Sequence, residues 1–131
     1  MLDRKTMATQ KQVKAACEEV LHIQEDIGRL LELPIIPGDP GAVFRCRLVL
    51  NRCSAAANTF GALRAKLPMT RDTVISHALI SRNEQILKNQ KHTVSSLIEC
   101  IRLNNAAALE AKRAALAAES ILIGERIKNN V

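Results

Sequence analysis

Aromatic side chains are almost absent from this chain of 131 residues, which has no Trp, no Tyr and only two Phe, Phe44 and Phe60. Alternating patterns of β-branched residues are also missing, so nothing indicates a strand. The apolar bulk comes from Leu, Ile, Val and many Ala, which mesh well between packed helices. We therefore expect one all-α domain, an antiparallel helical bundle or coiled-coil hairpin with a long C-terminal helix.

The chain also lacks an uncharged apolar run of membrane-spanning length, and its first ten residues (MLDRKTMATQ) contain no apolar core of a secretion signal. A membrane span and a secreted protein are therefore not expected. No CxxC pair is present, which argues against a zinc site. Each cysteine occupies an apolar position of a helical pattern, so we expect four buried, reduced thiols in a cytoplasmic protein. These are Cys17, Cys46, Cys53 and Cys100.

Signatures of catalysis are missing too. The five glycines form no phosphate-binding loop, and no cofactor motif is recognisable. Glu19 and His22 have the E-x-x-H spacing of helical metal sites, but the second motif that such sites need is absent. We therefore expect no metal, no cofactor and no enzymatic activity.

Prolines divide the chain into helical segments. A first helix is expected over residues 9–33, with Thr9 as its N-cap and Pro34 as its end. Residues 34–41 (PIIPGDPG) contain three prolines and two glycines and must form a loop. A second helix is expected over residues 40–67, because Asp39 followed by proline is a favourable helix start and Pro68 stops the helix.

Both helices show an apolar stripe with steps of three and four residues, the pattern of packed bundles. In the first helix Gln24 interrupts the stripe. Its apolar members are Val13, Cys17, Val20, Ile27 and Leu31, with Ile23 beside them. The second helix has the cleaner stripe, made of Val43, Cys46, Leu50, Cys53, Ala57, Phe60, Leu63 and Leu67.

Residues 71–128 follow a second turn, where Thr70 is a suitable N-cap, and no proline interrupts them. A continuous helix of this length would measure roughly 85 Å, about twice the length of either earlier helix. We expect a break or kink where poor helix formers interrupt the stripe, at residues 81–83 or at Asn104 and Asn105. The stripe consists of Val94, Leu97, Ile98, Ile101, Leu109, Leu116 and Ile123.

The first two helices are too short to cover this whole stripe, which leaves two interpretations. Either a partner helix covers the remainder, or the segment folds back and buries its own stripe. The candidate partner-binding residues that this stripe supplies beyond position 109 are Leu116, Leu122, Ile123 and Ile127.

The formal net charge is +6, and residues 40–67 carry five basic side chains and no acidic one. The candidate basic surface consists of Arg45, Arg47, Arg52, Arg64 and Lys66. The simplest interpretation is a solvated face, or one paired within the molecule, because the first helix is acidic and could lie beside it. The segment is also compatible with an acidic protein or with nucleic acid. The arginines are scattered around the helix and no stacking aromatics accompany them, so nucleic acid is the less favoured partner.

Residues 83–109 (NEQILKNQKHTVSSLIECIRLNNAAAL) resemble the C-terminal helix of flagellar export chaperones of the FlgN type. In that family a long amphipathic helix carries an L-N-x-x-N-G-x-L-like core after an apolar run. Residues 103–109 supply a Leu-Asn pair, a second Asn, small residues and a Leu. The resemblance implies client binding through Leu103, Asn104, Asn105 and Leu109. It also implies a cytoplasmic role in type III secretion, in which junction subunits of the flagellum are kept unassembled until export.

Function is therefore expected to consist of protein binding by helices. The preferred hypothesis is an adaptor that resembles an export chaperone. A basic helical protein that binds nucleic acid and a structural coiled-coil subunit that forms homo-oligomers are the two alternatives.

Overall fold

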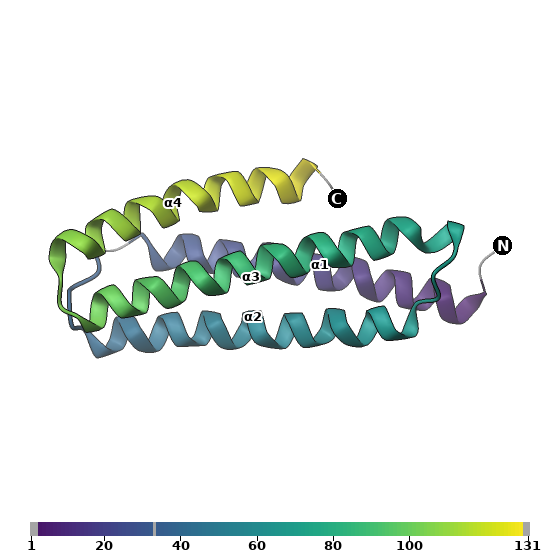
Figure 1. Ribbon diagram of the computed structural model, residues 1–131, viewed down its shortest axis with the longest axis horizontal. Coiled ribbons are helices and arrows are strands. Elements are labelled where there is room, and N and C mark those ends of the chain that lie inside the picture. Colours follow the sequence, from purple (N-terminus) through teal and green to yellow (C-terminus); the bar gives the residue numbers. More distant parts are fainter. Residues whose placement is uncertain (1–2, 33, 130–131) are drawn as a thin grey trace.

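The protein is an all-α bundle, as expected. The computed structural model describes residues 3–32 and 34–129, and the side chains of residues 127–129 lie outside this description. Every regular element in the described ranges is a helix (Figure 1). The elements are α1 (Arg4–Leu30), α2 (Pro40–Lys66), the 3₁₀ turn η1 (Arg71–Thr73), α3 (Val74–Arg102) and α4 (Ala106–Asn129).

The first helix begins and ends earlier than the sequence predicted. Its N-cap is Asp3, whose carboxylate accepts a hydrogen bond of 2.7 Å from the Thr6 amide, and the predicted cap Thr9 is buried inside the helix. The helix ends at Leu30 because Leu31 and the residue after it already form tighter, i to i−3 backbone bonds ahead of Pro34. The predicted last residue, Leu33, lies outside the described residues.

The second helix starts at Pro40 as predicted and ends at Lys66, one residue before its predicted end. The Asp39 side chain accepts from the Gly41 amide at 2.9 Å, with Pro40 in the first turn. Its buried positions alternate in steps of four and three: Ala42, Cys46, Val49, Cys53, Ala56, Phe60, Leu63 and Leu67. Three positions differ from the predicted stripe by one residue, since Val43, Leu50 and Ala57 are only half-buried. At two of these positions the prediction chose the larger side chain, Val43 over Ala42 and Leu50 over Val49, whereas α2 packs against two helices and turns the smaller one inward.

The predicted long C-terminal helix is two antiparallel helices. Of the two expected break sites, residues 81–83 lie inside the continuous α3, and the chain reverses at Asn104, whose φ is 54°. Asn104 tolerates this left-handed conformation better than most residues. The Asn105 side chain then accepts from the Ala108 amide at 3.0 Å and caps α4. The C-terminal segment therefore folds back on the bundle.

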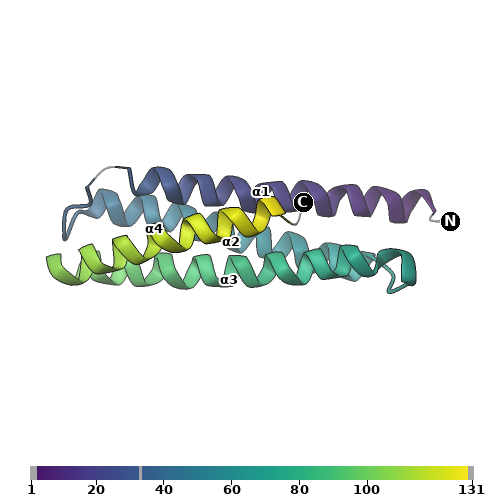
Figure 2. The same cartoon turned by 90° about the horizontal axis from the view of Figure 1, so that it is seen from above.

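Three long helices form the core, and α4 is added to one side. The helices α1, α2 and α3 contain 27, 27 and 29 residues and pack lengthwise against one another. The main contacts of α4 are with α3 and α1. Figure 2 shows α4 lying along the line between these two helices and ending near the middle of α1.

The turn provides a test of the fold. Replacing Asn104 with Val should lower the free energy of unfolding by about 1–2 kcal/mol, because a β-branched residue resists a positive φ. Asn104→Gly is the matched control and should leave stability nearly unchanged, since glycine adopts this conformation freely. Urea denaturation followed by circular dichroism measures both, and equal losses in the two variants would contradict the turn.

Candidate functional site

The groove between α1 and α3 is the place where this protein already binds a helix, its own α4. Leu109 and Leu116 of α4 are buried in the groove, and Ile123 is half-buried there. Polar contacts fix the register of the helix. The Gln24 side chain donates to the Ser120 carbonyl at 3.0 Å. The Arg113 guanidinium donates to the Leu31 carbonyl at 3.3 Å.

A buried polar pair lies under α4. Gln90 of α3 donates to the side-chain oxygen of Gln24 in α1 at 2.6 Å, and both side chains are buried. At the edge of the groove, Thr93 donates to the Glu119 carboxylate at 3.0 Å. Directional bonds of this kind favour one register between helices over its neighbours.

The same groove continues past the end of α4 without a cover. With 24 residues, α4 is shorter than α3 and leaves the N-terminal parts of α1 and α3 open (Figures 1 and 2). A cavity of about 570 Å³ lies there, between Met7 to Lys14 of α1 and Asp72 to Leu79 of η1 and α3. Its apolar lining consists of Met7, Val13, Ile75 and Leu79.

Two of these side chains are unusually exposed for large apolar residues. Met7 is 49% and Ile75 is 74% exposed, although both border an apolar groove. Lys11 and Lys14 lie beside them on α1. The open half of the groove therefore has an apolar floor and a basic rim, features that suit the apolar face of a helix.

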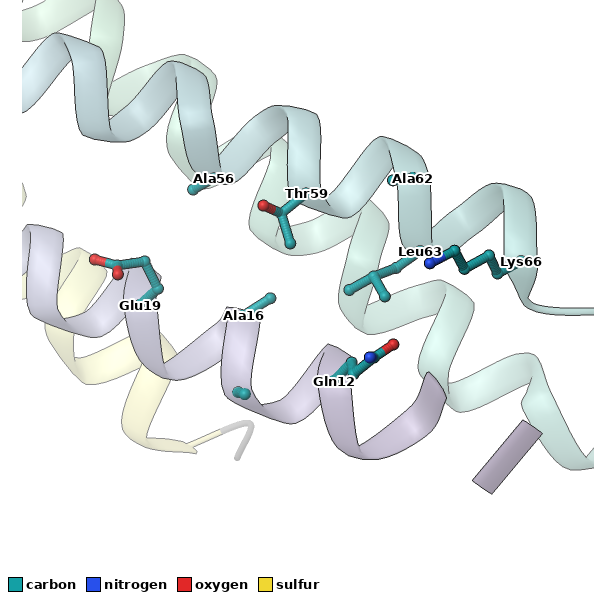
Figure 3. Close-up of a pocket in the computed structure, with 9 residues that line it drawn as sticks. Gln12, Ala16, Glu19, Ala56, Thr59, Ala62, Leu63 and Lys66 are labelled. Atoms are coloured by element: carbon teal, nitrogen blue, oxygen red, sulfur yellow. The ribbon is translucent and has the colours of Figure 1, made fainter. Parts of the chain in front are cut away.

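The groove between α1 and α2 is less suitable. Figure 3 shows Ala16 and Glu19 of α1 facing Ala56 and Thr59 of α2 across a cavity of about 530 Å³. Its apolar surface comes mainly from alanine. Farther along, the Arg52 guanidinium bridges the two helices by pairing with the carboxylates of Glu19 and Asp26.

An ion pair also crosses the groove between α2 and α3, where Arg64 binds Glu84 and lies 3.3 Å from the Ser81 hydroxyl. Two of the five residues of the predicted basic surface, Arg52 and Arg64, are therefore paired within the bundle. The other three, Arg45, Arg47 and Lys66, are exposed.

The predicted partner-binding residues are divided between the turn, the core and the surface. Leu103 is exposed and, with Asn104 and Asn105, forms the turn before α4. The core members are Leu109 and Leu116.

The remaining candidates lie toward the end of α4. Leu122 is exposed on α4, and Ile123 is half-buried. The side chain of Ile127 lies outside the described residues.

The cysteines do not form a reactive site. All four are free, and Cys17, Cys46 and Cys53 are buried as predicted, whereas Cys100 is only half-buried. Burial raises the pKa of Cys46 and of Cys53 to about 11, which keeps both thiols protonated at neutral pH. Within the described ranges, no three His, Cys, Asp or Glu side chains are grouped as a metal site would require.

The residues of the open groove were not singled out from the sequence. The first helix was predicted to begin at Thr9, which leaves Met7 outside it, and Ile75 precedes the predicted stripe that begins at Val94. The signal that could have found them is a difference in length. A break at Asn104 makes the last helix shorter than the one before it. The N-terminal part of that longer helix must therefore stay uncovered.

Among the described helices, none combines the length and apolar character needed to cross a membrane. The chain matches no family model, no curated protein and no solved structure.

Proposed function

We propose that this protein is a non-enzymatic adaptor that binds an amphipathic helix of a protein partner in the open half of the α1–α3 groove. One observation carries the proposal: α4 occupies the other half of this groove by the same means that a partner helix would use. The groove is thus continuous with an existing helix–helix interface, and its open floor is apolar.

The dimensions of the groove suit a short helical segment. Met7 and Lys14 are seven residues apart, roughly 10 Å along α1. A partner helix of two to three turns would lie along this length, with apolar anchors spaced by three and four residues. It would shield Met7, Ile75 and Leu79 from water.

The resemblance to export chaperones provides the most specific form of this proposal. In that form the protein is a cytoplasmic adaptor that keeps a subunit of a flagellar or type III secretion system unassembled. The general form, binding of a partner helix, depends only on the groove. It is preferred to nucleic-acid binding because Arg52 and Arg64 are already paired with acidic side chains.

A pair of neighbouring substitutions tests the proposal. Ile75→Asp places a charge in the groove and should reduce partner capture at least tenfold, because a buried aspartate must be desolvated. Val74→Asp is the matched control: Val74 is also in the first turn of α3 and 53% exposed, but it does not line the groove. Quantitative affinity capture from native cells, followed by mass spectrometry, compares the same captured protein across both variants.

Both variants should keep the helicity and thermal stability of the parent, since both side chains project into solvent. A partner lost equally from the two variants, or kept by both, would rule out the groove. Light scattering of the purified chain addresses self-association. A dimer that Ile75→Asp dissociates would show that a second copy, and not another protein, occupies the groove.

A further inference from the structure

We infer that the helix bound by the open half of the groove is acidic along its edges. This inference rests on the proposed function and adds the chemical character of the partner. It follows from how charge is distributed along α1 and from how α4 meets the opposite end of the same helix.

The open end of the groove is basic. Residues 4–17 of α1 contain four basic side chains, Arg4, Lys5, Lys11 and Lys14, and no acidic one. Lys11 and Lys14 line the groove and are exposed, and no ion pair is found for either among the described residues. A helix lying beside them would gain from glutamate or aspartate at its flanks.

The residues of η1 and α3 that face α1 change the positive charge of the groove little. Asp72 is the one acidic side chain among the residues lining the cavity, and its backbone carbonyl accepts from Gln10 at 3.3 Å. Arg71, a basic residue, directly precedes Asp72 in the sequence. Both α1 and the η1–α3 segment begin at this end of the bundle, so their positive helix ends add to the field (Figure 1).

The C-terminal half of α1 has a different charge. It contains Glu18, Glu19, Glu25 and Asp26, of which Glu19 and Asp26 pair with Arg52 of α2, and its last turn presents backbone carbonyls at the negative helix end. The helix that binds this half brings a cation to the end of α1, since Arg113 of α4 donates to the Leu31 carbonyl. The helix bound at this end of α1 thus places a cation on the negative helix end, and the basic N-terminal end of α1 favours a helix with acidic side chains.

The apolar floor favours a protein helix over nucleic acid. Phosphate groups would satisfy Lys11 and Lys14 but would leave Met7 and Ile75 in contact with water or with a polar backbone. An amphipathic acidic helix would cover the apolar floor with its apolar face and pair with the lysines of the rim through its acidic side chains.

The test uses the full chain and two synthetic helical peptides of about 18 residues, a length at which helicity can be supported by design. Both peptides carry the same leucine stripe. One has glutamate at its flanking positions and the other has lysine. Fluorescence anisotropy measures their binding at low and high salt, with a short DNA duplex as competitor.

The acidic peptide should bind more tightly than the basic one, and its affinity should fall with salt. The double variant Lys11→Glu with Lys14→Glu should bind the acidic peptide roughly tenfold more weakly and the basic peptide more tightly. The matched control is Arg47→Glu with Lys66→Glu, two exposed cations of α2 outside the groove, and it should have a far smaller effect.

Each alternative outcome has a distinct meaning. Equal binding of the two peptides without salt dependence would overturn the acidic partner while leaving helix binding intact. Binding of neither peptide would contradict the proposed function itself. Displacement of the acidic peptide by sub-stoichiometric DNA would show that the basic rim serves nucleic acid instead.

Discussion

Replacing Phe60 with Ala should lower the free energy of unfolding by about 3–5 kcal/mol. Phe60 is fully buried and is the largest completely buried side chain in the described core. It lies on the face of α2 that packs into the bundle, within a row of smaller neighbours, so the surrounding helices cannot easily fill the space it leaves. A domain of this size is stabilised by about 5–15 kcal/mol in all, so much of that stability would be lost.

Phe44→Ala is the matched control, because Phe44 is the other aromatic residue and belongs to the same helix but is 62% exposed. It should change stability by no more than about 0.5 kcal/mol. Urea denaturation at constant temperature measures both variants. Similar losses for the two would show that α2 is rotated relative to the arrangement described above.

Raising the pH from 9 to 11 should also destabilise the fold strongly, through the thiols of Cys46 and Cys53. Burial raises the pKa of each from 9.0 to about 11. Between these values the unfolded chain releases a proton that the folded protein retains, so deprotonation favours unfolding. The stabilisation is complete below pH 9 and is lost as the pH rises through about 11, with a loss on the order of 2 kcal/mol for each thiol.

The absence of tyrosine removes the other side chain that commonly titrates near pH 10 and could be buried. The control is the double variant Cys46→Ala with Cys53→Ala, which is less stable overall but lacks these two thiols and keeps Cys17, whose pKa burial also raises. Its unfolding free energy should fall much less steeply over the same pH range. Parallel curves for the parent and the variant would indicate that lysine titration, and not thiol burial, causes the alkaline loss.

The helices could be predicted because their signals are local. Asp39 followed by Pro40 sets the start of α2, Pro68 follows its end, and a regular heptad-like stripe indicates its buried face. The fold class follows from the same features. The exact core positions of α2 were harder to assign, because which side chains turn inward depends on the two helices packed against it.

The arrangement of the last two helices depends on contacts that the sequence does not display. Asn104 was one of two predicted break sites. The end of α3 before it is held by the loop between α1 and α2, where the Gly38 amide donates to the Ile101 carbonyl at 2.7 Å. Gln24 could be recognised as an interruption of an apolar stripe. Its partner Gln90 is 66 residues away and could not be identified.

The candidate site is the least predictable part for the same reason. Met7 and Ile75 are remote in sequence and become neighbours only when α1 and α3 pack together. Their exposure results from the point at which α4 ends, which is set by the turn at Asn104. The sequence indicated that the apolar stripe of the C-terminal segment would need a cover. In the structure, the uncovered apolar surface lies instead at the N-terminal ends of α1 and α3.

Backbone amide chemical shifts of the full-length protein, recorded by NMR during titration with the acidic amphipathic peptide, test helix binding in the α1–α3 groove most directly. We expect the largest changes in chemical shift to cluster at residues 7–14 and 72–79, with α4 remaining in place. Changes centred on Ala16, Thr59 and Ala62 in the α1–α2 groove, or spread evenly over the surface, would contradict it.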